Sequence, residues 1–134
     1  MKTLIKLFLT ASLSFFILDM LWLLLISKKL YQDYLGTLLG QVRIGPAALF
    51  YVLYVLGMLF FAITPALAKE SLSYAWLAGG FLGLLCYATF DLTNLATLRD
   101  WPVLITVIDL VWGTVITAVV SAITVATAQY FNWR

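Results

Sequence analysis

Three aspartates lie inside long apolar stretches of this sequence, where a charged side chain is unusual: Asp19, Asp91 and Asp109. Insertion measurements assign a mid-membrane aspartate a cost of roughly 2.5 to 3.5 kcal/mol, so each such residue is a candidate for function. Carboxyl groups in an apolar layer can exchange a proton, pair with a cation, or divide the roles of acid and base in catalysis.

A tryptophan accompanies two of these acids at the same spacing. The segments "ILDMLW" near the start of the chain and "VIDLVW" near its end both carry the pattern Asp-x-x-Trp. Residues three apart share one face of a helix, so Trp22 lies on the face of Asp19 and Trp112 on the face of Asp109. The two indoles are expected to form the floor and the roof of one polar pocket.

The third apolar stretch carries a polar stripe of its own. Tyr87, Asp91 and Asn94 follow one another at i, i+4 and i+7 and therefore lie on one helix face. Tyr51 and Tyr54 enter from the matching end of the second stretch. The candidate binding or proton-carrying residues are Asp19, Asp91, Asp109, Asn94, Trp22, Trp112, Tyr87, Tyr51 and Tyr54.

Other interpretations of these residues stay open. Asp91 and Asn94 could mark the interfacial end of a helix, with Asn94 near its C-cap, and Trp22 could belong to an aromatic belt. The two Asp-x-x-Trp patterns could also be a coincidence, or a remnant of duplication with purely structural hydrogen bonds. A buried acid nevertheless needs a partner, and at this depth the nearest candidates are the other two acids, Asn94, the tyrosine hydroxyls and the indole N–H groups.

The elements that position these residues are membrane helices. Of the 134 residues, 64% are hydrophobic and 10% are charged, and the mean hydropathy is +1.05, whereas about a quarter of a soluble domain is charged. Crossing a bilayer takes roughly 20 mostly apolar residues. The segments that meet this requirement are residues 4–26, 46–67, 71–94 and 103–128.

The sequence therefore predicts an all-α polytopic membrane protein, a four-helix antiparallel transmembrane bundle that forms a single domain over residues 1–134 within the lipid bilayer. Counted at 1.5 Å per residue, each of the three aspartates lies about 10 to 12 Å below the nearer end of its span. All three depths are measured from the same membrane face, because the fourth helix runs opposite to the first and third. The acids are thus expected to share one layer.

Several classes of protein are excluded by composition. The chain has no histidine, which rules out histidine-ligated haem, histidine-based zinc sites and Ser-His or Cys-His nucleophile pairs. Cys86 is the single cysteine, so no intramolecular disulfide forms. There is no basic patch for nucleic acid, and no cofactor is predicted. No metal is predicted either, since Ca²⁺ and Mg²⁺ usually take six or more oxygens.

The sequence of the first loop predicts an interfacial amphipathic helix over residues 29–42. Leucines, tyrosines and a valine recur there near helical period with polar residues between them, although Gly36 and Gly40 weaken the helix. This helix lies over the membrane face nearest the acids, so it is a candidate lid as well as a candidate surface anchor.

Close helix packing is indicated by Gly79 and Gly83, which are four residues apart in "AGGFLG". Packing within the bundle is favoured over a homodimer face, but a homodimer stays open. Membrane orientation is also open. Four basic residues flank each side, and the amino terminus and first helix favour termini in the cytoplasm, whereas three basic residues in the first loop favour the reverse.

The run "YATFDLTNLATLRDW", together with "ILDMLW" and "VIDLVWG", resembles a family of small bacterial four-helix membrane proteins that is catalogued as a domain of unknown function. The resemblance covers essentially the whole chain, and "YATFDLTNLAT" is its most specific part. It implies an integral protein of the bacterial inner membrane. It brings no activity, substrate or cofactor.

Function is left with three hypotheses. The first is binding or transport of a lipophilic or protonatable small molecule with proton coupling at the aspartates. The second is a membrane-embedded acid-base enzyme, similar to an isomerase, that acts on an isoprenoid or lipid. The third is a structural or accessory subunit whose polar layer specifies helix packing.

Overall fold

The computed structural model describes residues 2–37, 39–40 and 43–133, apart from the side chain of residue 26. Within these residues the secondary structure is helical, with no strand. In chain order the elements are α1 (Lys2–Leu21), the π-helical η1 (Trp22–Ser27), α2 (Lys28–Leu35), α3 (Ile44–Met58), the π-helical η2 (Leu59–Ile63), α4 (Thr64–Ala68), α5 (Leu72–Thr97) and α6 (Val103–Tyr130).

The described residues form four helices long and apolar enough to cross a membrane, which confirms the prediction of an all-α polytopic bundle. Only helices and closed barrels satisfy every backbone polar group within hydrocarbon. Leucine, phenylalanine and valine side chains cover much of the outer surface, as expected where lipid is the solvent. The spans cover Lys2–Leu25, Ile44–Ala68, Leu72–Thr97 and Val103–Tyr130.

Two of the spans contain a π-helical turn. In η1 the Ser27 hydroxyl donates to the Trp22 carbonyl oxygen at 3.1 Å, five residues back. The second π-turn, η2, ends at Ile63, two residues before Pro65, which has no N–H to donate to the preceding turn. The wider turn therefore accommodates a proline inside a membrane helix.

The helix of the first loop differs from the expected range of 29–42. The chain passes from α1 through η1 into α2 without a break, and α2 ends at Leu35. Gly36 follows directly, and glycine is the weakest helix former after proline. Residues 38 and 41–42 of the expected helix lie outside the described residues. The observed loop helix is therefore an eight-residue extension of the first span.

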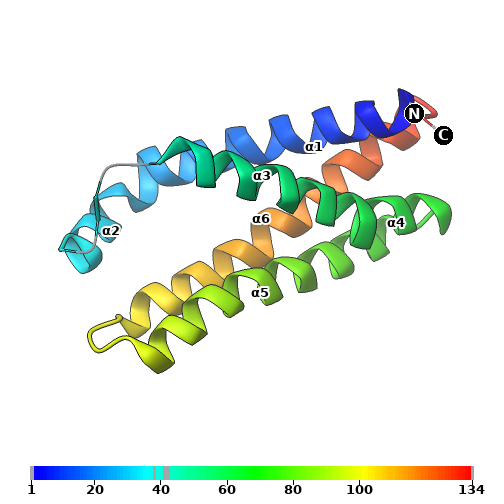
Figure 1. The fold of residues 1–134 in the computed structure, drawn as a ribbon. Helices are drawn as coiled ribbons and strands as arrows, with labels where there is room; N and C mark the ends of the chain where they lie inside the picture. Colours follow the sequence, from blue (N-terminus) through cyan, green and yellow to red (C-terminus); the bar gives the residue numbers. More distant parts are fainter. Residues whose placement is uncertain (1, 38, 41–42, 134) are drawn as a thin grey trace.

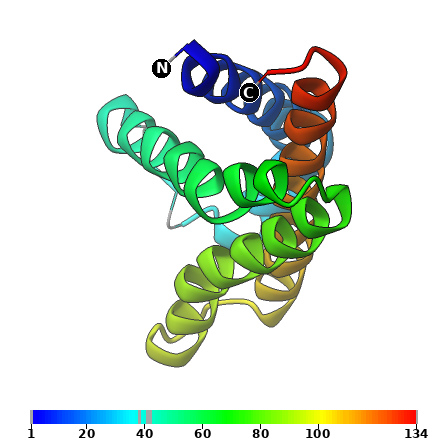
Figure 2. The same ribbon diagram turned by 90° about the vertical axis from the view of Figure 1, so that its right-hand side faces the viewer.

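The spans form two pairs that diverge at one end of the molecule (Figure 1). α5 and α6 pack along their length, whereas the second span contacts α5 through η2 and α4. α1 lies beside α3 in the other pair and also contacts α6. The two termini lie together at the opposite end (Figures 1 and 2). The wedge between the pairs opens at the end where α2 lies.

Small residues bring α5 and α6 into close contact. A Cβ at Gly83 would lie 2.1 Å from the Gly113 carbonyl oxygen, and one at Gly79 would lie 2.6 Å from the Ser121 hydroxyl. A Cβ at Gly113 would lie 2.2 Å from the Tyr87 ring. Gly79 and Gly83 therefore face α6 within the same chain, and Gly113 leaves the space that the Tyr87 ring occupies.

Candidate functional site

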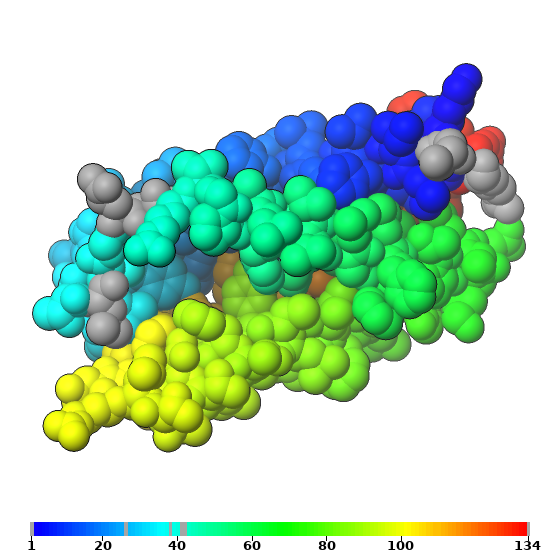
Figure 3. All heavy atoms as spheres, viewed as in Figure 1, coloured from blue at the N-terminus to red at the C-terminus, as the bar shows by residue number. Residues whose placement is uncertain are grey.

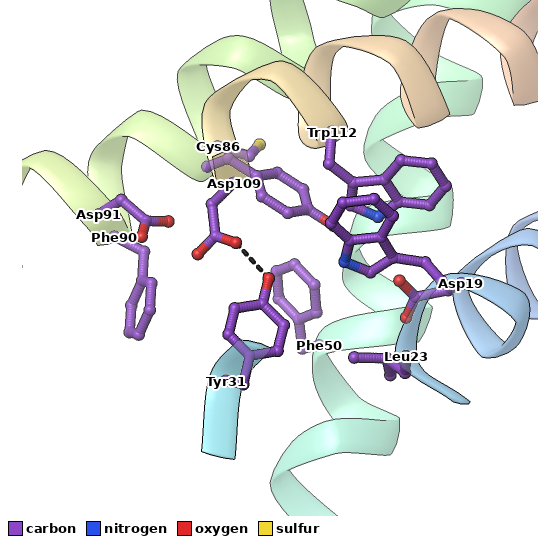
Figure 4. Close-up of a pocket in the computed structure, with 11 residues that line it drawn as sticks. Asp19, Leu23, Tyr31, Phe50, Cys86, Phe90, Asp91, Asp109 and Trp112 are labelled. Carbon is purple, nitrogen blue, oxygen red and sulfur yellow. Dashed lines mark hydrogen bonds between the residues drawn. The ribbon is translucent and has the colours of Figure 1, made fainter. Parts of the chain in front are cut away.

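A cavity of about 400 Å³ lies in the wedge between the helix pairs. Its wall combines carboxyl groups with aromatic rings. The side chains that line it come from all four spans, including η1, and from α2 (Figure 4). The lining residues are Asp19, Asp91, Asp109, Trp22, Trp112, Tyr31, Tyr87, Phe50, Phe90, Leu23 and Cys86.

Six of the nine candidate residues from the sequence line this cavity, the three acids, both tryptophans and Tyr87. The other three are Tyr51, Tyr54 and Asn94, and none of them is among its lining residues. Tyr51 still contacts the site, because its hydroxyl donates to the carboxylate of Asp19, which lines the cavity. Tyr54 forms a hydrogen bond with Thr117, and its ring lies 6.5 Å from that of Tyr87.

Asn94 lies one turn nearer the membrane surface than Asp91. Its backbone carbonyl accepts from Leu98 N at 2.8 Å, at the end of α5. Among the predicted roles, this position fits the C-terminal end of the helix rather than the cavity wall.

The two tryptophans stack directly on each other, so they line the cavity together and do not form its floor and its roof, in contrast to the prediction from the sequence. The ring centroids of Trp22 and Trp112 are 4.4 Å apart and the rings are within 9° of parallel. Stacked aromatic pairs contribute about 0.5 to 1.5 kcal/mol beyond the area they bury. Both indole N–H groups are buried without a hydrogen-bond acceptor among the described residues. The stack therefore connects η1 to α6.

The three carboxyl groups have different surroundings. Asp109 accepts a hydrogen bond from the Tyr31 hydroxyl, and Asp19 accepts one from Tyr51. Asp91 is only 1% exposed, and no described group forms a hydrogen bond with either of its oxygens. Figure 4 shows its carboxyl group beside that of Asp109. The adjacent Asp109 carboxyl can serve as its partner only if the two groups share a proton, because two carboxylates offer acceptors alone.

Basic side chains do not compensate these acids. Within the described part of the chain, no lysine or arginine forms an ion pair with Asp19, Asp91 or Asp109. No group of three or more acidic, cysteine or histidine residues there has the arrangement of a metal site. The negative charge available in the cavity thus has no counterion from the described residues.

Tyr31 is the main site residue that sequence reasoning missed. It belongs to α2, outside the spans, and its hydroxyl reaches over the cavity to Asp109 (Figure 4). Burial, followed by the hydrogen bond and the negative charge of Asp109, raises the pKa of the Tyr31 hydroxyl well above its usual range. Tyr31 therefore stays protonated and acts as a donor at any physiological pH.

Cys86 and Phe90 were also missed, although their spacing contained a signal. Cys86 and Phe90 are four residues apart and lie next to Tyr87 and Asp91, respectively. The helix face that carries Tyr87 and Asp91 therefore adjoins Cys86 and Phe90. Phe50 likewise lies next to a predicted site residue, Tyr51. The sequence does not indicate that the phenylalanine, and not the tyrosine, lines the cavity.

Replacement of Tyr31 by phenylalanine should loosen α2 from the bundle. The variant leaves a carboxylate oxygen of Asp109 without its donor, which costs about 1 to 3 kcal/mol. We expect faster backbone hydrogen exchange in α2 and faster proteolysis of the first loop. Tyr34→Phe is the control, since Tyr34 lies on the same helix and is exposed. Equal exchange rates in the two variants would show that the hydrogen bond does not hold α2.

The fold defines a class: a small multi-pass membrane protein with four helices long and apolar enough to cross a membrane among its described residues. A family model described as "Predicted membrane protein (DUF2177)" matches residues 4–126, and the chain belongs to this family. The match confirms the resemblance to a membrane protein family of unknown function. No curated protein and no solved structure matches the chain.

Proposed function

We propose that the protein binds a small lipophilic cation, of the kind formed by a protonated or quaternary amine, and exchanges it for a proton on the aspartates of the cavity. The observation that carries this proposal is Asp91, whose buried carboxyl group lines the cavity without any hydrogen-bond or cationic partner among the described residues. We further propose the bacterial inner membrane as its location.

Charge balance links the cation to the proton. Asp91 and Asp109 lie side by side in a low-dielectric layer, where two carboxylates without a counterion are strongly unfavourable. A proton can neutralise one of them when the cavity is empty, and a ligand cation can do so when it is filled. The two therefore compete for the same negative charge, which is the basis of proton-coupled binding.

The rest of the wall suits the apolar body of such a ligand. The stacked indoles of Trp22 and Trp112 and the Tyr87 ring present aromatic surface, to which cations bind with about 0.5 to 2 kcal/mol. A volume of about 400 Å³ falls within the range of small-molecule sites. An aromatic wall with a few convergent acids thus selects for an apolar ligand with one positive centre.

One observation favours catalysis as the alternative. Asp109 accepts a hydrogen bond from Tyr31, whereas Asp91 accepts none, and unequal surroundings of this kind can separate an acid from a base. A membrane-embedded isomerase would use this asymmetry. Turnover of an isoprenoid substrate without binding of a cation would favour that function.

Equilibrium binding of radiolabelled phenyltrimethylammonium to the purified protein in lipid nanodiscs tests the proposal. We expect saturable binding that strengthens as pH rises, because fewer protons then compete for the carboxyl groups. A pH indicator in weakly buffered solution should report proton release on binding. The neutral isostere tert-butylbenzene is the control and should not displace the cation. Absence of saturable binding, or binding without proton release, would contradict the proposal.

A further inference from the structure

We infer that the cavity opens sideways into the bilayer between α3 and α5, so that its ligand is an amphiphile whose cationic head reaches Asp91 while its hydrocarbon tail stays among the lipids. This inference rests on the proposed cation site and names the ligand class and its route. It follows from which sides of the cavity are closed.

Two sides are closed by side chains that meet across them. The stack of Trp22 on Trp112 joins η1 to α6. On the side of the membrane surface, α2 lies over the cavity, with Tyr31 bonded to Asp109 and Leu35 buried. A water-soluble cation that approaches from this surface therefore meets α2 first.

Among the described residues, side chains meet across the side between α3 and α5 at a level deeper than Asp91, where the Tyr54 ring on α3 lies 6.5 Å from the Tyr87 ring on α5. No ring contact joins α3 to α5 nearer to α2 among these residues. α5 contacts the second span through η2 and α4, beyond the end of α3, and α3 and α5 diverge towards α2 (Figure 1). Figure 3 shows a hollow between these two helices near the α2 end. The helices thus frame an opening at the outer surface of the bundle, where the surrounding solvent is lipid.

Two phenylalanines mark the edges of this opening. Phe50 on α3 and Phe90 on α5 both line the cavity, yet they are 50% and 59% exposed. Each ring therefore contacts the cavity and the outside at once. In Figure 4 Phe90 lies beside Asp91, and Phe50 lies on the other side of the Tyr31 ring. On the proposed route the hydrocarbon tail passes between the two phenylalanines.

The depth of the opening suits an amphiphile. Phe50 is six residues from the start of its span at Ile44, and Asp91 is six residues from the end of its span at Thr97. At 1.5 Å per residue this places both about 9 Å inside the helix ends. A cationic head that normally lies among the headgroups needs only a short descent to reach the carboxyl group. Its tail remains in hydrocarbon throughout.

Competition in nanodiscs tests this opening separately from the cation site. Radiolabelled phenyltrimethylammonium occupies the site, and unlabelled hexadecyltrimethylammonium, added at a low mole fraction of the lipid, is the competitor. We expect the long-chain cation to displace the short one in the parent protein. Phe50→Trp and Phe90→Trp, which narrow the opening, should each weaken binding of the long-chain cation about tenfold more than they weaken binding of the short cation.

Phe81→Trp is the matched control, because Phe81 is 61% exposed on the same helix as Phe90 and does not line the cavity. It should leave both affinities unchanged. If the short cation binds and the long one fails to displace it, the sideways opening is wrong and the cation site stands. If Phe81→Trp weakens displacement as much as Phe90→Trp does, the sideways opening is also wrong. If the short cation does not bind, both proposals fail together.

Discussion

Gly83→Ala is expected to destabilise the bundle by about 1 to 3 kcal/mol, the usual range for overpacking. The new Cβ would lie 2.1 Å from the Gly113 carbonyl oxygen and 2.5 Å from the Thr117 hydroxyl. A backbone oxygen cannot rotate away, so α5 and α6 must separate along their contact. Thermal unfolding in detergent, followed by circular dichroism, should show a clear decrease in Tm.

Gly57→Ala is the matched control for this prediction. Gly57 also lies within a membrane helix, but a Cβ there would meet no atom within 4 Å. Alanine is a better helix former than glycine by about 1 kcal/mol, so Tm should stay the same or rise. A similar decrease in both variants would mean that backbone flexibility, rather than the contact of α5 with α6, explains the result.

The transmembrane helices could be predicted from the sequence because the thickness of the hydrocarbon core sets their minimum length. A run of about 20 apolar residues is needed to cross hydrocarbon, and it is visible without knowledge of tertiary contacts. Among the four spans, the largest difference between an expected and an observed boundary is three residues, from 94 to Thr97. Helix ends are set by local turns such as the one at Leu98, which hydropathy does not report.

Part of the candidate site could be predicted for a similar reason. Depth within a span follows from counting residues, and helical spacing fixes which residues share a face. These two rules place Asp19, Asp91 and Asp109 in one layer, and the structure brings them to one cavity. Which side chains meet inside that layer depends on helix rotation and tilt. For that reason Tyr51 contacts Asp19 from outside the cavity wall.

The position of α2 could not be predicted from periodicity. An amphipathic pattern shows that a helix has an apolar face, but not whether that face meets lipid or protein. Here α2 continues α1 through η1, and this continuity directs Tyr31 over the cavity to Asp109. π-turns of this kind often occur at functional sites. Their position depends on hydrogen bonds that the sequence does not reveal.

Asp91→Asn is expected to remove proton-coupled cation binding and to leave the fold intact. The substitution keeps the size of the side chain and abolishes its charge. Loss of one partner of a buried charge pair costs about 2 kcal/mol or more, so affinity for phenyltrimethylammonium should fall roughly 30-fold or more. Because an asparagine amide can donate to the Asp109 carboxyl as a protonated Asp91 would, the substitution should not lower Tm. Proton release should disappear.

Two further variants make this prediction specific to the cavity. Asp109→Asn should also fold, since its amide oxygen can still accept from Tyr31, and should also lose pH-dependent binding. Asp100→Asn, at an exposed turn between α5 and α6, removes the same charge away from the site and should bind like the parent. A structural polar layer would produce the opposite pattern, in which Asp91→Asn binds the cation like the parent. Such a result would remove the aspartate pair from the mechanism, because a ligand that competes with a proton must lose affinity when the titrating group is gone.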